Sequence, residues 1–229
     1  MRSALWIAVL ACIAAIGCRS PSTEPVFDPD AGEFDASIED DAGPGELCPP
    51  GAPDLFNNTY SPFMGGEGSV DLEVAVFASL RCIHCAEFSM MWKGIWDTRP
   101  DIRARVRLYY HHFPPYEADA WKVHASAVAA GKQGMEHFWA LHDHLYQLLA
   151  DENVALSSAS VRAYCDEVLH LDMAQFDEDV ADPYTDAFLE WDKAQGDAGG
   201  VAGTPSVFVC GEKIGWGSLE EVIDGYLNE

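Results

Sequence analysis

The sequence is poor in basic residues. Among 229 residues, 13 Lys and Arg oppose 38 Asp and Glu, which gives a formal net charge of −25. Proteins bind nucleic acid largely by neutralising phosphates, so this deficit, without any run of Lys or Arg, excludes nucleic acid as a partner. A wholly disordered chain is also excluded, because 48% of the residues are hydrophobic and 11% are aromatic, which is enough apolar surface for a core.

Long hydrophobic runs are lacking too, and no internal repeat is visible. The 14 mostly apolar residues from Ala4 to Gly17 fall short of the roughly 18 to 20 that span a bilayer. They follow one positive charge and end at Cys18, a layout typical of a signal peptide. Because Ala-Ile-Gly-Cys at 15–18 resembles a bacterial lipobox, we expect a lipoprotein-type signal peptide over 1–17, lipid attachment at Cys18 and a lipid anchor in the membrane. Ordinary secretion with cleavage nearby is the alternative.

Both possibilities place the protein outside the cytosol. Arg19 stands where many lipoproteins retained in the inner membrane have Asp, which favours the outer membrane and a domain that faces the periplasm of a bacterial cell envelope. Residues 19–46 carry nine acids against Arg19 among Pro, Gly, Ala and Ser, a composition that cannot form a core. We therefore predict an acidic flexible linker over 18–46, which starts at the lipidated cysteine, and one domain over 47–229 with a net charge of −18.

Hydrophobic periodicity predicts that this domain is α/β. Four segments have the alternating or wholly apolar pattern of β-strands: 70–77, 105–110, 206–209 and 213–216. Helical spacing follows the first strand as far as Pro100, fills 116–197 in four or five segments, and returns after a capping box at Ser218 and Glu221. A right-handed crossover makes the first two strands parallel, and the late hairpin adds antiparallel neighbours to a sheet of about four strands.

The motif that carries chemistry is Cys82-Ile83-His84-Cys85, where the first strand passes into the first helix. A thiol at a helix N-terminus faces unpaired backbone N–H groups and the positive end of the helix dipole, so its thiolate is favoured and its pKa falls. Arg81 and His84 are placed to add to this effect. The same stabilisation makes the sulfur a good leaving group, so a disulfide between Cys82 and Cys85 is expected to be reactive and oxidising.

The strand, the C-x-x-C at a helix start and Gly203-Thr204-Pro205 before a late hairpin together resemble the thioredoxin fold. The motif sequence Cys-Ile-His-Cys and the helical block between the two halves of the fold resemble those of the DsbA-like thiol:disulfide oxidoreductases of bacterial envelopes, here in a lipoprotein form. The resemblance implies an α/β, thioredoxin-like fold over 47–229. It also implies a helical insertion at about 116–183, between the second and third core strands.

The same resemblance implies a role for each residue of the site. Cys82 is then the exposed attacking cysteine, Cys85 is the more buried resolving cysteine, and His84 tunes the thiolate. Pro205 matches the cis-proline of the family, and the backbone of Thr204 pairs with an extended substrate peptide. No cofactor is implied. The implied partners are proteins that carry thiols or disulfides, and a redox partner that resets the pair.

Two positions depart from the family pattern. Val76 stands six residues before the first cysteine, where relatives often have a buried acid, so the usual proton acceptor for Cys85 is missing. Ile83 stands where the strongest oxidant of the family has Pro, so the reduction potential does not carry over. We expect a thiol:disulfide oxidoreductase, and an oxidase in preference to a reductase or isomerase, because Arg81 and His84 favour the thiolate.

Two functions of other classes compete with this one. The first is a metal-binding lipoprotein that uses Cys82, His84 and Cys85, although no second C-x-x-C or C-x-x-H completes a four-ligand zinc site. The second is a thioredoxin-fold binding module whose CIHC is redox-inert, which the missing acid at Val76 favours.

The remaining histidines and cysteines are less informative. We expect structural or solvated positions, rather than metal ligands or a substrate groove, for His111, His112, His137, His142 and His144. An odd number of cysteines remains once the signal peptide, the lipidated residue and the redox pair are set aside, so their pairing stays open: Cys48, Cys165 and Cys210.

Overall fold

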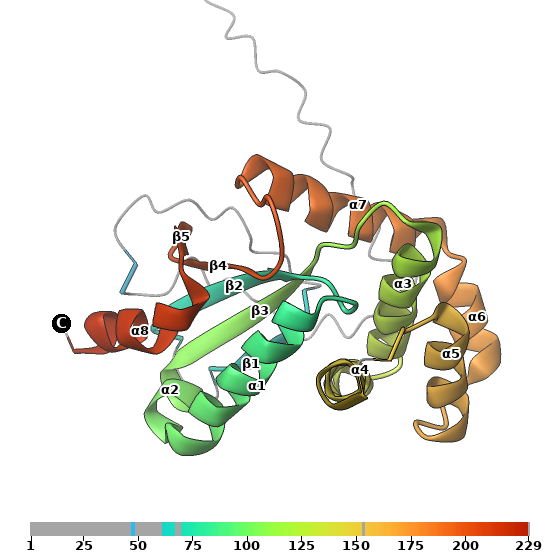
Figure 1. Cartoon of the computed structure of the whole chain (residues 1–229), viewed down its shortest axis with the longest axis horizontal. Helices are drawn as coiled ribbons and strands as arrows, with labels where there is room; N and C mark the ends of the chain where they lie inside the picture. The colour runs from blue at the N-terminus through green and yellow to red at the C-terminus, as the bar shows by residue number, and fades with distance from the viewer. Residues whose placement is uncertain (1–46, 49–60, 67–69, 153, 229) are drawn as a thin grey trace, which may run out of the picture. The chain divides into compact units, whose positions relative to one another are not determined.

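The computed structural model describes residues 47–48, 61–66, 70–152 and 154–228. The expected signal peptide, the lipid attachment at Cys18 and the linker up to residue 46 lie outside the described residues. Within these ranges, no helix is long and apolar enough to cross a bilayer. The described residues form a mixed sheet flanked by helices (Figure 1).

The sheet confirms the predicted α/β class and adds one strand to it. In chain order the strands are β1 (Phe63–Gly65), β2 (Leu72–Ala78), β3 (Val106–His112), β4 (Ser206–Val209) and β5 (Glu212–Ile214). They lie side by side in the order β1-β3-β2-β4-β5. As predicted, β2 and β3 are parallel and the late hairpin is antiparallel. The prediction missed β1 because three residues are too few to show an alternating pattern.

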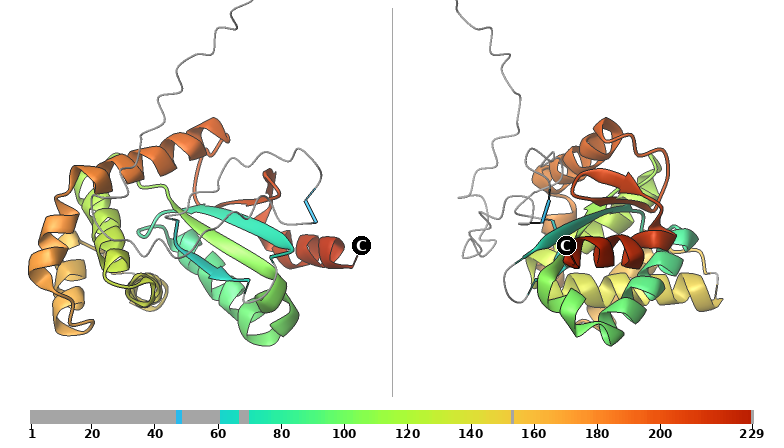
Figure 2. Two further views of the ribbon diagram at one scale, coloured as in Figure 1. Left: turned by 180° about the vertical axis from the view of Figure 1, so that it is seen from behind. Right: turned by 90° about the vertical axis from the view of Figure 1, so that its left-hand side faces the viewer.

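The central strand β2 is buried on both faces, because successive side chains of a strand point to opposite sides. Val76 belongs to the main core beside α1 (Ile83–Thr98), whereas Phe77 belongs to a second cluster on the other face. That second face is covered by α7 (Pro183–Ala198), where a Cβ on Gly196 would lie 2.9 Å from the Phe77 ring. Figure 2 shows α1 and α7 on opposite sides of the sheet.

The helical block between β3 and β4 consists of separate short helices, as predicted. They are α3 (Ala118–Lys132), α4 (Met135–Glu152), α5 (Ser158–Glu167), α6 (Met173–Val180) and α7. The chain turns between α3 and α4 at Gly134, whose φ of 149° suits glycine. Asp182 caps α7 by accepting a hydrogen bond from the Tyr184 N–H, and Pro183 occupies the first turn.

Two further helices complete the fold: α2 (Pro100–Arg105) follows α1, and α8 (Leu219–Leu227) ends the described chain. The predicted capping box of Ser218 with Glu221 is wrong. Ser218 closes a 3-10 turn over Trp216–Ser218, and its side chain makes no capping hydrogen bond to α8.

Two of the three unassigned cysteines form a disulfide. Cys48 is bonded to Cys210, which lies 162 residues further along the chain, whereas Cys165 is buried with a free thiol. Cys210 directly follows β4, and the Leu47 N–H donates a hydrogen bond to the Asp71 carbonyl at 3.0 Å. The entry of the chain into the domain is therefore fixed to the sheet by one covalent bond and one hydrogen bond.

We predict that replacing Cys48 and Cys210 together by Ala lowers the free energy of unfolding by about 2–5 kcal/mol, because the disulfide restricts the unfolded chain. Urea unfolding followed by circular dichroism measures the loss. Each single Ala variant should lose nearly as much as the double variant, since the two sulfurs act as one unit. Two smaller losses that add up to the double-variant value would contradict the bond.

Candidate active site

Cys82 and Cys85 lie where β2 passes into α1. Cys82 caps the N-terminus of this helix with an extended backbone (φ −102°, ψ 120°). The Cys85 N–H donates to the Cys82 carbonyl at 3.0 Å, so the two residues share the first turn. Cys82 is partly exposed and Cys85 is completely buried. The pair therefore consists of one accessible and one inaccessible sulfur.

The surroundings of Cys82 favour its thiolate. A hydrogen bond from the Cys85 thiol lowers the pKa of Cys82 from 9.0 to about 5, against the opposing effect of burial, and backbone hydrogen bonds from His84 and Cys85 contribute to the shift. These N–H groups belong to the first turn of α1, where the helix dipole stabilises negative charge. Burial raises the pKa of the Cys85 thiol, and the neighbouring Cys82 raises it further. At neutral pH the outer sulfur is a thiolate and the inner sulfur is a thiol.

The Thr204–Pro205 loop lies directly beside Cys82. The peptide bond between these residues is cis, and the Thr204 carbonyl oxygen lies 3.3 Å from Cys82 Sγ. The strand register explains this contact, because Ser206 at the start of β4 pairs with Phe77 near the end of β2. Antiparallel pairing thus brings together two motifs that are 122 residues apart in the sequence.

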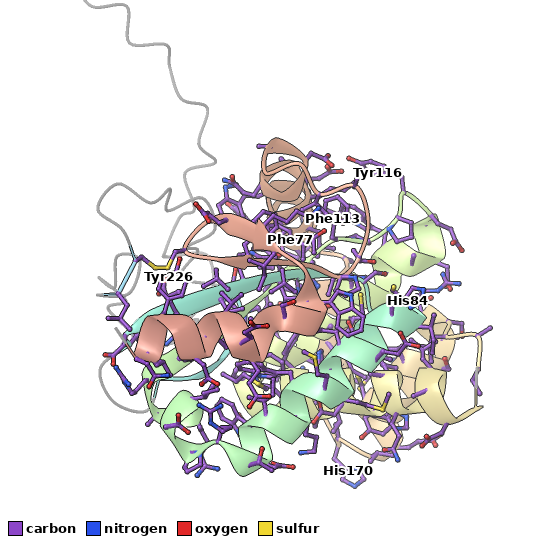
Figure 3. All side chains as sticks on the ribbon, turned by 60° about the vertical axis from the view of Figure 1, so that its left-hand side comes forward. Phe77, His84, Phe113, Tyr116, His170 and Tyr226 are labelled. Atoms are coloured by element: carbon purple, nitrogen blue, oxygen red, sulfur yellow. A yellow bond between two sulfur atoms is a disulfide. The ribbon has the colours of Figure 1, made fainter. Side chains whose placement is uncertain are left out.

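His84 of the motif and Arg81, which precedes the motif, both pair with carboxylates. His84 lies exposed at the start of α1 (Figure 3), with Nδ1 2.9 Å from Glu87 Oε2, and this hydrogen bond raises the pKa of His84. Arg81 Nη1 lies 3.1 Å from Glu117 Oε1 and 3.6 Å from Asp119 Oδ2, at the start of α3. The low pKa of Cys82 therefore comes from hydrogen bonds with Cys85, with Thr204 and with the first turn of α1, whereas Arg81 connects the residue before Cys82 to the helical insertion.

Two buried histidines hold the loop that precedes Cys82. The Leu80 N–H donates to Nε2 of His124 on α3 at 3.1 Å, and His124 Nδ1 lies 2.8 Å from Nδ1 of His112 on β3. Since Nε2 of His124 accepts, its proton is on Nδ1 and is donated to His112. Burial lowers the pKa of His124 to about 3 and that of His112 well below its ordinary value, so both rings are neutral. His112 is therefore structural, as expected.

A buried carboxylate joins the same region to α7. Asp192 Oδ1 lies 3.0 Å from Nδ1 of His111, and Asp192 Oδ2 accepts from the His112 N–H at 2.7 Å. Burial raises the pKa of Asp192. Sequence reasoning missed both His124 and Asp192, because neither belongs to a motif. The one local signal was the alanine-rich surroundings of His124, which indicate a helix buried on most sides.

The histidines of α4 are not arranged as a metal site. His142 is buried, with Nδ1 2.9 Å from Asp143 Oδ1, and the ring of His144 stacks on Tyr164 at 3.7 Å between centroids. The expectation of a solvated position is wrong for His142, since its ring packs against Tyr146 at 4.5 Å in the core. In the described part of the chain, no group of three or more His, Cys, Asp or Glu is placed to hold a metal ion.

Comparison with known proteins identifies the family. The family model described as Thioredoxin matches residues 58–229, so the chain belongs to the thioredoxin family. A search of curated proteins found no match. The strand order, the helical insertion and the cis-proline loop agree with this family, which confirms the predicted fold class.

Several solved structures share the fold. A thioredoxin-like oxidoreductase from Silicibacter pomeroyi DSS-3 has a TM-score of 0.63 at 24% identity, with 76% of this chain and 96% of that chain covered. BdbD from Bacillus subtilis has a TM-score of 0.64 at 15% identity, covering 74% and 94%. The thiol-disulfide exchange protein alpha-DsbA2 from Wolbachia pipientis has a TM-score of 0.63 at 16% identity, covering 75% and 90%. The fold is thus that of the DsbA-type oxidoreductases.

We predict that Cys82 titrates with a midpoint near pH 5, because hydrogen bonds at the start of α1 place its pKa at about 5. The ultraviolet absorbance of the thiolate in the reduced protein measures the midpoint. A Cys85→Ala variant should titrate at higher pH, since it lacks the thiol that donates to Cys82. A midpoint near the ordinary value of 9.0 in the wild type would contradict this description of the helix start.

We predict that acid destabilises the protein through His124. Its pKa is about 3 in the folded protein and 6.5 ordinarily, so the unfolded chain binds the proton first as the pH falls. The stabilisation is complete above pH 6.5 and is lost towards about pH 3, at about 1.4 kcal/mol per pH unit for one proton. Urea unfolding at several pH values measures the slope.

A His124→Asn variant should show a smaller slope between these pH values than the wild type. The matched control is His170→Asn, at an exposed residue with a φ of 53°, a conformation that Asn tolerates. This control should keep the wild-type slope. Equal slopes for the His124 variant and the wild type would show that the buried ring does not carry the effect.

Proposed function

We propose that the protein is a thiol:disulfide oxidoreductase of the bacterial cell envelope, which exchanges disulfides with protein thiols through Cys82 and Cys85. The observation that supports this proposal most strongly is the juxtaposition at the site. An accessible sulfur with a pKa of about 5 lies 3.3 Å from the carbonyl of a cis-proline loop, one helical turn from a buried thiol.

In the oxidising direction, a substrate thiolate attacks Cys82 Sγ in the Cys82–Cys85 disulfide. The bond between the two cysteines breaks, Cys85 leaves as a thiolate that then takes up a proton, and a mixed disulfide joins Cys82 to the substrate. A second substrate thiolate attacks the substrate sulfur of that bond, and Cys82 leaves as a thiolate. The substrate has lost two electrons, and the enzyme pair has gained them.

The low pKa of Cys82 favours this direction. A thiolate that is stable at neutral pH is a good leaving group in the second step, and it stabilises the reduced enzyme relative to the disulfide. We therefore propose an oxidase in preference to a reductase or isomerase. In the reducing direction the same groups act in reverse, with Cys82 as the attacking sulfur and Cys85 as the resolving one.

The neighbouring residues have assigned roles in the proposal. Thr204 and Pro205 bind an extended substrate peptide beside Cys82, because the Thr204 carbonyl already lies at the sulfur. His84 tunes the thiolate from the exposed face, where the charges of Glu87 and Cys82 both raise the pKa of the imidazole. The partners are protein thiols and disulfides, together with a redox partner that returns the pair to the disulfide.

The proposed location follows from the N-terminal residues. A lipid on Cys18 would anchor the domain to a membrane, and Arg19 favours the outer over the inner membrane. A periplasmic thioredoxin-like protein from Salmonella enterica serovar Typhimurium shares the fold, which supports a periplasm-facing domain.

A redox-inert binding module is the second candidate function. It is favoured by Val76, which is buried on β2 where relatives often have the acid that serves the inner cysteine. The thiol-oxidation assay below decides between the two functions, because a redox-inert site leaves a dithiol substrate unchanged.

We predict that the oxidised protein converts a reduced dithiol peptide to its disulfide. We also predict that a reduced Cys85→Ser variant, mixed with the disulfide form of the peptide, accumulates a mixed disulfide on Cys82, because the Cys82 thiolate attacks the peptide disulfide and releases one peptide sulfur as a thiolate. The variant lacks the sulfur that resolves the intermediate. Peptide mass mapping identifies the bonded cysteine. The Cys82→Ser variant is the matched control and should trap no substrate.

Adducts on Cys165 in place of Cys82 would contradict the assignment of the attacking sulfur. The direction of exchange is read from the equilibrium reduction potential against glutathione. A value near about −120 mV supports the oxidase, whereas one near about −270 mV would contradict it in favour of a reductase.

A further inference from the structure

A cavity adjoins the buried sulfur of the redox pair. Its volume is about 210 Å³, and its wall includes Cys85 on α1, Val76 on β2, and residues of β3 and α4. The polar side chains of the wall are Ser89, Lys93, Tyr110, His142, Asp143 and Tyr146. A cavity with several polar partners and far more than the roughly 15 Å³ that one water needs is suited to hold a short chain of waters.

The cavity matters because Cys85 must exchange a proton in every reaction cycle. Its thiol has a pKa raised by burial, and the thiolate that leaves the disulfide is unstable in the same apolar surroundings. The acid that relatives often supply from β2 is replaced here by Val76, which faces this cavity. A proton donor and acceptor for Cys85 must therefore come from another part of the wall.

His142 lines the same cavity as Cys85. The residue is only 5% exposed, and its Nδ1 lies 2.9 Å from Oδ1 of Asp143, whose side chain is 58% exposed. Because the carboxylate accepts the Nδ1 proton, the basic nitrogen of the neutral ring is Nε2. The ring packs against Tyr146 at 4.5 Å and against Tyr110 at 5.4 Å between centroids. His142 thus connects a solvent-exposed carboxylate with the polar groups around Cys85.

The two tyrosines connect this ring with the loop that carries the cysteines. The hydroxyl oxygens of Tyr110 and Tyr146 lie 3.4 Å apart, and the Tyr146 hydroxyl donates to the Ser79 carbonyl at 3.2 Å. Burial raises the pKa of both tyrosines well above the ordinary value. They therefore keep their protons and can pass one along, but they cannot be the final acceptor.

We propose that His142, paired with Asp143, is the proton-exchange partner of Cys85, acting through water and the tyrosine hydroxyls of the cavity. This inference rests on the proposed function. In the oxidising direction, the Cys85 thiolate takes one proton and the His142 imidazolium becomes neutral. In the reducing direction, the Cys85 thiol gives its proton to Nε2 as its sulfur attacks the mixed disulfide on Cys82, and the substrate leaves as a thiolate.

Several groups of the neighbouring elements set the charge around His142. On α4 these are Asp143 and Tyr146, on α1 they are Lys93 and the Cys85 thiol, and on β3 they are Tyr110 and His112. The tyrosines are neutral, and burial keeps His112 neutral too. Among the described residues of the cavity wall, Asp143 and Lys93 are the carboxylate and the ammonium group. Lys93 Nζ also lies 3.9 Å from Asp97 Oδ2, and the Cys82 thiolate acts on the two tyrosines from the other side of Cys85.

The test follows the two thiols separately. Reduced protein is mixed with one equivalent of the chromogenic disulfide dithiobis-nitrobenzoate in a stopped-flow instrument. Attack by Cys82 releases the first nitrothiobenzoate, and attack by Cys85 on the resulting mixed disulfide releases the second. We expect His142→Gln to slow the second phase on the order of 100-fold and to flatten its pH profile, with the first phase unchanged.

The matched control is His144→Gln, on the same helix two residues away, whose ring stacks on Tyr164 outside the cavity wall. Both phases of this variant should be as in the wild type. Asp143→Asn provides a second variant at an exposed side chain, which covers the case that His142→Gln fails to fold. It should slow the second phase, because the Nδ1 proton of His142 loses the carboxylate that accepts it.

The outcomes separate this inference from the proposed function. A second phase of His142→Gln or Asp143→Asn with the wild-type rate and pH profile overturns the role of His142 and leaves the exchange reaction intact. If the wild type releases no nitrothiobenzoate from Cys82, the proposed function fails and the role of His142 fails with it. Equal slowing of both phases would also overturn the proposal, since it indicates a general structural defect.

Discussion

The contact between Cys82 Sγ and the Thr204 carbonyl depends on one constraint, the antiparallel pairing of β2 with β4. This register places Ser206 opposite Phe77, so the end of one strand and the start of the other converge on the same edge of the sheet. The cysteine pair and the cis-proline loop are distant in sequence, and the pairing of β2 with β4 brings them together. The position of the cis-proline loop beside the accessible thiolate follows from that pairing.

The helical insertion makes polar contacts with this arrangement in addition to its apolar packing in the core. His124 holds the Leu80 N–H, Tyr146 donates to Ser79, and Arg81 pairs with the start of α3. Each of these contacts is made to a residue of the short loop between β2 and α1. The His124 and Tyr146 contacts are buried, where polar groups are costly unless satisfied, whereas the Arg81 pair lies at the surface. Together these contacts hold the loop that leads into Cys82.

Much of the fold could be predicted because it is encoded locally. The alternation in β2, the helical spacing after Cys82 and the apolar run of β4 each lie within a few residues. The short strand β1, the partner of Cys48 and the burial of His142 could not be predicted, since each depends on residues far along the chain. His142 is instructive, because the sequence places it among polar neighbours of a helix, and only the packing of α4 on the sheet buries it. The two cysteines and the proline loop were found by motif, whereas His124 has no motif.

The bond between Cys48 and Cys210 gives the domain a mechanical property. A force on the chain before Leu47 acts through the Cys48–Cys210 disulfide on the end of β4. The disulfide keeps Cys48 attached to the domain under this force. The bond thus joins the N-terminal end of the domain to β4, which pairs with β2 at the centre of the sheet.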